Sequence, residues 1–314
     1  MKVRYALTYA LIIGHILLSC NSTTPIKELE NTVQVNTIDT NVISRKRIEN
    51  RPSEIDKQKP KVQVQQTSVQ NEIENISPKG ILIIHAFVPL CDNENQGIVP
   101  VNETLGDGLN LKTNLYWGAL YGVKTHIKRQ ASWKYLNSSY NVNADILERA
   151  IFSKRINGKT LYLIADAYRG DRMKECLKDY FAAASGNKTD SLTILDSNLG
   201  IAGSSDLIIF NGHNGLMDCD VNHSINNDGR KRDVAAIGCI SFPYFKAFFK
   251  SANATPVLTT TNLLAPEAYV MDALITSWAK DQKGETIRTS VAQAYNKYQK
   301  CGLRGAKALF KSGW

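Results

Sequence analysis

Between residues 21 and 78 the sequence contains no glycine and no aromatic residue. The segment is rich instead in Asn, Gln, Thr, Ser, Glu and Lys. Without aromatic residues, and with polar residues in the majority, it cannot bury enough apolar surface to offset the entropy that a chain loses on folding. We therefore expect no packed core here. Together with Cys20, the segment is predicted to form a flexible tether over residues 20–79.

The start of the sequence lacks an apolar run long enough to cross a bilayer. Residues 5–18 are mostly apolar, with interruptions at Thr8 and His15, and they follow the basic residues Lys2 and Arg4. A membrane-spanning helix needs roughly 20 apolar residues, more than this stretch offers. A short apolar stretch behind a basic start is typical of a cleaved signal peptide, which we place at residues 1–19.

The signal segment ends in Leu17-Leu18-Ser19-Cys20, which resembles a bacterial lipobox. That resemblance implies that Cys20 is diacylated and becomes the mature N-terminus. An ordinary secretory signal with an incidental cysteine is the alternative interpretation. Because more than one acyl chain anchors a protein stably, the sequence predicts an exported protein bound to a membrane of the bacterial cell envelope. Asn21 is not the Asp that would suggest retention in the inner membrane, so we expect the outer membrane.

Charge and cysteine content narrow the possible partners. The formal net charge is +9, and it becomes +7 when Lys2 and Arg4 leave with the signal peptide. The charge is spread along the chain, as on a solvated surface, so we expect no nucleic-acid partner. Five cysteines remain besides Cys20. An odd number leaves at least one thiol unpaired, or paired between chains, in an oxidising compartment.

Residues 80–314 show the alternation of short apolar runs and amphipathic segments that is typical of an α/β domain. Two strands lead to His213 and to Cys239. Further strands are predicted at 81–87, 151–155, 160–165 and 257–260, and helices at 115–129, 171–185, 242–251, 265–280 and 285–300. The pattern predicts a mostly parallel sheet flanked by helices on both faces.

Two of these strands end on side chains that can do chemistry. One apolar run leads into Asn211-Gly212-His213, and the next leads into Gly238-Cys239. If the two strands are neighbours, the imidazole and the thiol emerge from the same edge of the sheet, where α/β proteins place their sites. A histidine can serve there as general base for a thiolate nucleophile. A buried core cysteine and a loop histidine are the simpler interpretation of each residue taken alone.

The two motifs resemble the catalytic motifs of the caspase-like group, which includes caspases, metacaspases, gingipain-type peptidases and CHAT domains. In that group one strand ends at a catalytic His with a nearby Gly, and the next ends at a small residue before the catalytic Cys. The resemblance implies a caspase-like three-layer sandwich over residues 80–314 and a cysteine endopeptidase that uses His213 and Cys239. In this sequence Asn214 separates His213 from Gly215, and Gly238 stands where an alanine is common.

Backbone N–H groups near Asn214 and Gly215 and at Cys239 are predicted to hold the oxyanion of a peptide substrate. Gly215 and Gly238 would allow the close approach that this requires. Asp92, beyond the first strand and near His85 and Cys91, is a candidate for orienting the imidazole or for binding a basic substrate side chain. A solvated loop carboxylate is the simpler interpretation of Asp92. Two carboxylates on a late helix, Glu267 and Asp272, are weaker candidates.

Two hypotheses from other classes remain open. Asp218, Cys219, Asp220 and His223 could join His213 in a metal site, but their spacing matches no strong zinc pattern. We therefore expect no metal and no cofactor; Cys219 could instead pair with another cysteine. The other alternative is a non-catalytic binding lipoprotein on the same scaffold, with a ligand face made from aromatic residues that also suit a core: Tyr116, Trp117, Tyr121 and Trp133. A reactive Cys239 favours the peptidase, and a Cys239 held in a disulfide favours the binding protein.

Overall fold

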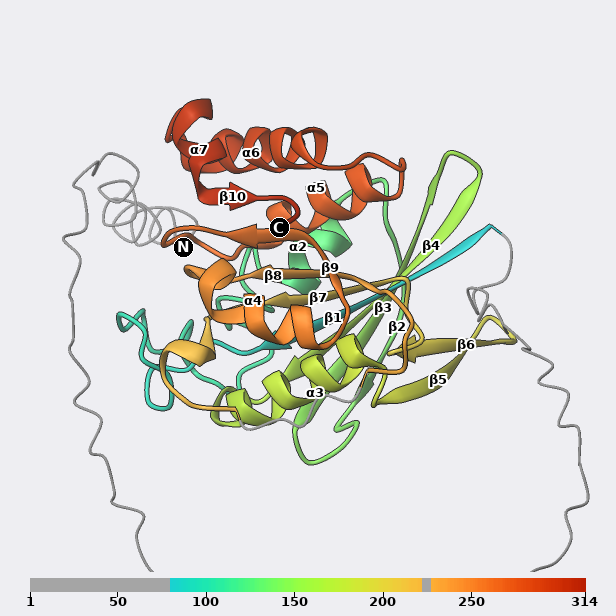
Figure 1. Ribbon diagram of the computed structural model, residues 1–314. Coiled ribbons are helices and arrows are strands. Elements are labelled where there is room, and N and C mark those ends of the chain that lie inside the picture. The colour runs from blue at the N-terminus through green and yellow to red at the C-terminus, as the bar shows by residue number, and fades with distance from the viewer. Residues whose placement is uncertain (1–79, 222–226) are drawn as a thin grey trace, which may run out of the picture. The chain divides into compact units, whose positions relative to one another are not determined.

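The computed structural model describes residues 80–221 and 227–314, and it shows the predicted α/β sandwich of three layers (Figure 1). Within these ranges an eight-stranded sheet has the order β10-β9-β8-β7-β1-β4-β3-β2. The predicted signal peptide, Cys20 and the tether lie outside the described residues. No helix in the described ranges combines the length and apolar character needed to span a membrane.

The centre of the sheet is parallel and its margins are antiparallel. Parallel pairing joins β9, β8, β7, β1 and β4 in that order, whereas β3, β2 and β10 are antiparallel to their neighbours. The strands are β1 (Ile81–Pro89), β2 (Lys134–Tyr140), β3 (Ile146–Ile156), β4 (Lys159–Tyr168), β7 (Leu207–Asn211), β8 (Asp233–Ile237), β9 (Thr255–Thr260) and β10 (Phe310–Lys311). A separate hairpin pairs β5 (Thr189–Ile194) with β6 (Ser197–Ala202).

Alternate side chains of the central strand β1 enter two different cores, as expected for a strand covered on both faces. Ile84, Ala86 and Val88 pack in a cluster that includes residues of α2, α5 and α6. Phe87 instead packs with residues of α3 and α4 on the opposite face. The helices are α2 (Val123–Arg129), α3 (Met173–Ser185), α4 (Ser241–Ser251), α5 (Ala268–Trp278), α6 (Glu285–Gln299) and α7 (Leu303–Leu309). Figure 1 shows α3 and α4 on one side of the sheet and α5 and α6 on the other.

The helix predicted at 115–129 is only half present, because α2 begins at Val123. The preceding residues, 115–122, form turns in which the chain packs closely against nearby backbone. A Cβ atom at Gly118 would lie 2.3 Å from the carbonyl oxygen of Leu111, so this contact needs glycine. The Asn114 side chain fixes the turns further, since it accepts from Cys91 N and Tyr116 N and donates to the Cys91 carbonyl. Side-chain competition of this kind replaces helical backbone bonds.

The other predicted helices and strands are present, and the main additions lie at the margins of the fold. The sequence did not predict β2, the β5–β6 hairpin, α7 or β10. The hairpin strands are mostly exposed on one face and half-polar, which weakens their periodic signal. The helix predicted at 171–185 is a turn of 3-10 helix (Gly170–Arg172) followed by α3, and it ends at Gly186, whose φ is 83°. A left-handed glycine is a frequent helix stop.

Candidate functional site

The strands that lead to His213 and Cys239 are neighbours in the sheet. β7 and β8 pair in parallel, with Asn211 opposite Ile237, and Gly212 N extends the ladder with a 3.0 Å bond to the Ile237 carbonyl. His213 and Cys239 therefore each lie two residues beyond a paired position. Equal offsets in a parallel pair bring both residues to the same edge of the sheet.

Asn214 and Gly238 hold the two strand ends together. The Asn214 side chain is fully buried; its Nδ2 donates to the Cys239 carbonyl over 2.8 Å, and its Oδ1 accepts from Leu216 N over 3.2 Å. A Cβ atom at Gly238 would lie 2.8 Å from the Gly212 carbonyl oxygen, closer than a side chain tolerates. The sequence predicted Asn214 and Gly238 as neighbours of the oxyanion; the structure gives them these connecting contacts as well.

His213 is held by a carboxylate that the sequence did not assign to it. Its Nε2 lies 2.6 Å from Asp218 Oδ2, and the His213 side chain is only 6% exposed. The same Asp218 oxygen accepts from Gly97 N at 2.9 Å, so the loop after β1 fixes the carboxylate from the other side. With an anionic acceptor at Nε2, the neutral imidazole carries its proton there and has its lone pair at Nδ1.

Cys239 is a thiol that contacts backbone in this structure. Its Sγ donates to the Leu264 carbonyl oxygen at 3.6 Å. Burial raises the pKa of Cys239, and the bond to Leu264 only partly offsets this effect. Among the hydrogen bonds of the described residues, none joins His213 to Cys239. The structure therefore places the two residues at one edge with the thiol in its protonated form.

The chain turns sharply after Cys239. Ile240 has φ 48°, and its N–H donates to the Asn262 carbonyl at 3.1 Å. A β-branched residue in the left-handed region is a genuine backbone outlier, and outliers of this kind cluster at functional sites. α4 begins at the next residue, so Cys239 lies on a strand–turn–helix junction beside a helix N-terminus. A helix N-terminus favours a nearby thiolate.

Three backbone amides at this edge have no acceptor in the described part of the chain. The N–H groups of Asn214, Gly215 and Cys239 donate no hydrogen bond there. Gly215 is buried against α3, because a Cβ atom on it would lie 2.2 Å from Met173 Cγ. Unused donors beside a potential nucleophile are what an oxyanion requires.

The residues after β1 have structural contacts of their own. Asp92 Oδ1 accepts from Glu94 N and Asn95 N at 2.9 and 3.0 Å, and its Oδ2 accepts from Asn95 Nδ2 at 3.0 Å. Both carboxylate oxygens thus stabilise the local turn, and Asp218 rather than Asp92 holds the imidazole. Cys91 is buried, and burial raises its pKa to about 12. Its thiol is accordingly inert at neutral pH.

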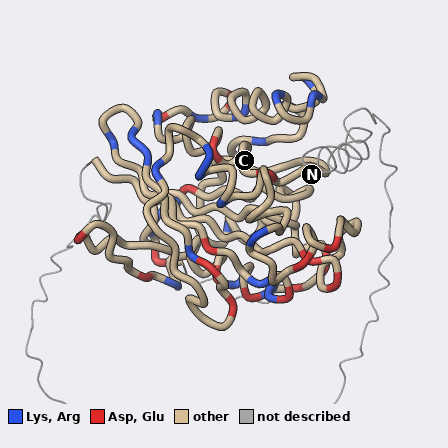
Figure 2. The backbone as a smooth tube through the Cα atoms, turned by 180° about the vertical axis from the view of Figure 1, so that it is seen from behind, with Lys and Arg blue, Asp and Glu red and all other residues tan. Residues whose placement is uncertain are grey.

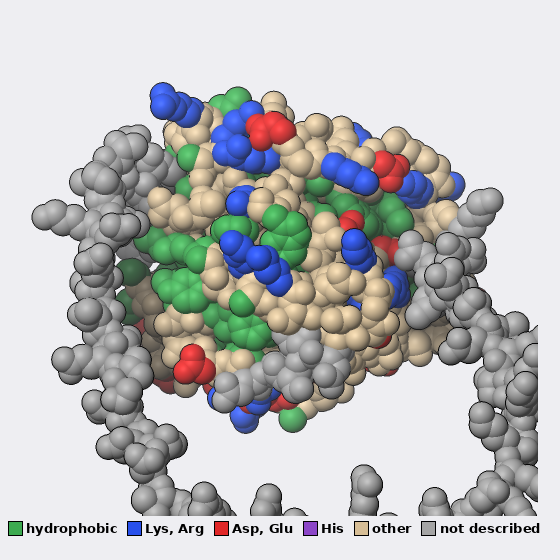
Figure 3. Space-filling model, in the orientation of Figure 1, with side chains coloured by type: hydrophobic (Ala, Val, Ile, Leu, Met, Phe, Trp, Pro, Cys, Tyr) green, Lys and Arg blue, Asp and Glu red, His purple; other side chains and the backbone are tan. Residues whose placement is uncertain are grey.

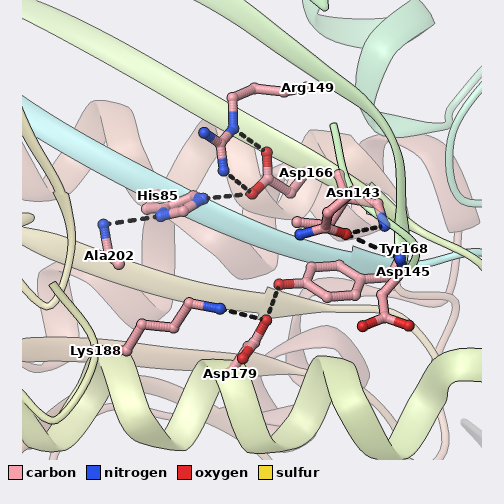
Figure 4. A network of polar contacts seen from close by, with 10 residues as sticks. His85, Asn143, Asp145, Arg149, Asp166, Tyr168, Asp179, Lys188 and Ala202 are labelled. Atoms are coloured by element: carbon pink, nitrogen blue, oxygen red, sulfur yellow. Dashed lines mark hydrogen bonds and ion pairs between the residues drawn. The ribbon is translucent and has the colours of Figure 1, made fainter. Parts of the chain in front are cut away.

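His85 lies inside the sheet in a closed polar network (Figure 4). Its Nδ1 accepts from Ala202 N at 3.0 Å, so the proton is on Nε2, which contacts Asp166 Oδ2 at 3.0 Å. Arg149 forms two 2.7 Å bonds to the same carboxylate. Burial acts to raise the pKa of Asp166, but His85 and Arg149 outweigh it and bring the pKa to about 2. Both ring nitrogens of His85 therefore have hydrogen-bond partners within the fold, and the residue connects the end of β6 to β1.

The metal hypothesis finds no support in the described ranges. No group of three or more His, Cys, Asp or Glu side chains there could hold a metal ion. Asp218 contacts His213, the Cys219 thiol donates to the Gly215 carbonyl at 3.3 Å, and His223 lies outside the described residues. Cys91, Cys176, Cys219 and Cys239 all carry free thiols, so within the described residues Cys219 forms no disulfide and Cys239 remains available for chemistry.

The loop from β9 to α5 forms a wall beside the two strand ends. Leu264 accepts from Cys239, and the Pro266 carbonyl accepts from Asn211 Nδ2 at 2.9 Å. Glu267 follows in this loop, 7% exposed, and burial raises its pKa to about 7. Asp272 instead accepts from Trp133 Nε1 at 2.8 Å and pairs with Lys154. The aromatic residues Tyr116, Trp117 and Trp133 are buried in the core, which favours a packing role.

The positions of Lys and Arg residues along the backbone are spread over several elements in the back view (Figure 2). No family model matches the chain, and neither does any curated protein or any solved structure.

Proposed function

We propose that the domain is a cysteine peptidase in which Cys239 is the nucleophile, His213 the general base and Asp218 the residue that positions the imidazole. The observation that carries the proposal is the placement of His213 and Cys239 at equal offsets beyond the paired strands β7 and β8. The Asp218 contact to Nε2 supports it, because it leaves the other ring nitrogen as the proton acceptor. In keeping with the sequence motif at Cys20, we propose that the enzyme is lipid-anchored in the bacterial cell envelope.

The first chemical step transfers the Cys239 proton to His213 Nδ1 after the thiol leaves the Leu264 carbonyl. The sulfur then forms a bond to the carbonyl carbon of a peptide, and the π electrons move to the oxygen. N–H groups of Asn214 or Gly215 and of Cys239 stabilise that oxyanion. Collapse breaks the C–N bond, and His213 gives its proton to the departing amine.

The second half of the reaction hydrolyses the thioester. His213 takes a proton from water, whose oxygen bonds to the acyl carbon, and the C–S bond breaks. The released sulfur regains its proton, which restores the starting thiol. Asp218 stays anionic throughout and stabilises the imidazolium that forms twice in the cycle.

A specific observation favours a second candidate, a binding lipoprotein on the same scaffold. The Cys239 thiol has a raised pKa and donates to a backbone carbonyl, as a structural cysteine does. The two candidates differ in what His213 does to the thiol. In a catalytic pair the His213 imidazolium lowers the pKa of Cys239. The reactivity of a structural cysteine would be the same in the wild type and in His213→Ala.

The test is the rate of iodoacetamide alkylation of each cysteine between mildly acidic and mildly alkaline pH. We expect Cys239 in the wild type to react at acidic pH faster than the half-buried Cys219, and to slow in both His213→Ala and Asp218→Asn. Asp220→Asn is the matched control, since Asp220 is an exposed carboxylate two residues away. Equal Cys239 rates in all four proteins would refute the peptidase and leave the binding protein.

A further inference from the structure

One face of α4 combines aromatic rings with unpaired cations. Phe242, Lys246 and Lys250 lie at successive i, i+4 positions, and Lys311 of β10 and Trp314 lie against them. The Lys311 and Lys246 amines are 3.9 and 5.4 Å from the Phe242 ring centre, and the Lys250 amine is 5.9 Å from that of Trp314. We call these five residues the α4–β10 patch. In Figure 3 green and blue side chains mix over this part of the surface.

The patch is open and carries only one sign of charge. Trp314 is 51% exposed, Lys246 and Lys250 are exposed, and Phe242 and Lys311 are partly exposed. α4 contains no acidic residue, and no Asp or Glu of the described ranges forms an ion pair with any of the three lysines. These lysines are therefore free to meet an external anion.

We infer that the α4–β10 patch docks on a membrane surface that contains anionic phospholipids. Aromatic rings with flanking cations are the composition that settles at the boundary between headgroups and acyl chains. A lipid surface needs only protruding side chains, which a helix face provides. An extended acidic polypeptide would gain most from unpaired backbone groups or a groove. The backbone of α4 is bonded within the helix, and in the edge strand β10 the carbonyls of Phe310 and Lys311 already accept from Arg288 and Thr259. The contact is distinct from the proposed lipid on Cys20 and would fix the orientation of the domain on the membrane.

The test compares binding of the full chain to vesicles of phosphatidylcholine alone and of phosphatidylcholine mixed with phosphatidylglycerol. The variant is Lys246→Gln, Lys250→Gln and Lys311→Gln. The matched control removes three exposed cations from other elements: Arg129→Gln at the end of α2, and Lys134→Gln and Arg155→Gln on β2 and β3, at the margin of the sheet opposite β10. Each interfacial lysine is worth roughly fivefold in affinity for an anionic surface, so the patch variant should bind about 100-fold more weakly to mixed vesicles. The control should lose far less.

A second measurement reports contact of the α4–β10 patch with lipid, independently of any membrane attachment through the N-terminal residues. Brominated acyl chains quench tryptophans that reach the lipid boundary, and the part of the quenching that disappears in Trp314→Phe measures Trp314. We expect such a part in mixed vesicles and its loss in the lysine variant. Equal weakening by both triple variants would show a general charge effect and overturn the inference. Two other results would overturn the membrane-docking inference. One is binding of polyglutamate that depends on the three patch lysines, with no binding to vesicles; the other is a dimer, seen in analytical sedimentation, that the lysine variant no longer forms.

Discussion

Glu267 is a buried carboxyl group whose charge should lower the stability of the domain at neutral pH. Glu267 lies in the loop between β9 and α5 and is only 7% exposed. Its hydrogen-bond partners are Gln299 Nε2 at 3.1 Å and Tyr269. No cation is among these contacts. Burial therefore dominates and raises its pKa from 4.5 to about 7.

The sign of the pH effect follows from proton binding. Between pH 4.5 and about 7 the folded protein keeps the Glu267 proton that the unfolded chain has lost, so the free energy of unfolding falls as pH rises. Each pKa unit corresponds to about 1.4 kcal/mol, and the total is about 3 kcal/mol. Glu267→Gln keeps the shape of the side chain and removes the charge. The stability of the variant relative to the wild type should therefore increase by about 3 kcal/mol between pH 4.5 and pH 7.

Urea unfolding of both proteins at a series of pH values measures this difference directly. Gln299 Oε1 is buried and has no hydrogen-bond partner among the described residues, so a glutamine amide at 267 also brings a donor to its neighbourhood. That gain is independent of pH, and only the slope of the difference tests the buried charge. Glu103→Gln, at an exposed glutamate, is the control and should give no slope. Parallel curves for wild type and Glu267→Gln would refute the reasoning.

Two further predictions concern the network around β1 and the contact between the strand ends. Asp166→Asn leaves the partly buried Arg149 guanidinium without its buried carboxylate and should cost about 3–5 kcal/mol of stability by urea unfolding, part of which Arg149→Leu in the same chain restores. Because the pKa of Asp166 is lowered to about 2, its contribution is present above pH 3.8 and is lost as pH falls towards 2; a wild type that keeps its full stability at pH 2 would contradict this. Gly238→Ala places a Cβ atom 2.8 Å from the Gly212 carbonyl oxygen and should cost about 1–3 kcal/mol, measured by the same unfolding assay. It should also alter the alkylation profile of Cys239, and an unchanged stability would show that the strand ends separate freely.

Much of the fold was readable from local pattern. Apolar runs of strand length marked β1, β4, β7 and β8, and amphipathic periods marked α3, α5 and α6, because buried strands and half-buried helices impose these patterns on any sequence. The hairpin β5–β6 and the strands β2 and β10 escaped prediction because they lie at margins, where one face meets solvent. The helix predicted at 115–129 was half wrong because Asn114 and the close approach at Gly118 outweigh helical periodicity.

The candidate site divides in the same way. The sequence by itself placed His213 and Cys239 after successive apolar runs, since strand ends are marked by composition. Only the tertiary structure made β7 and β8 neighbours in equal register, brought Asp218 and Gly97 to the imidazole, and directed the thiol to the Leu264 carbonyl. These contacts join residues that are brought together by the course of the loops and by packing against α3 and against the loop between β9 and α5. Local sequence encodes which segments are strands and helices, whereas long-range packing decides which polar groups meet.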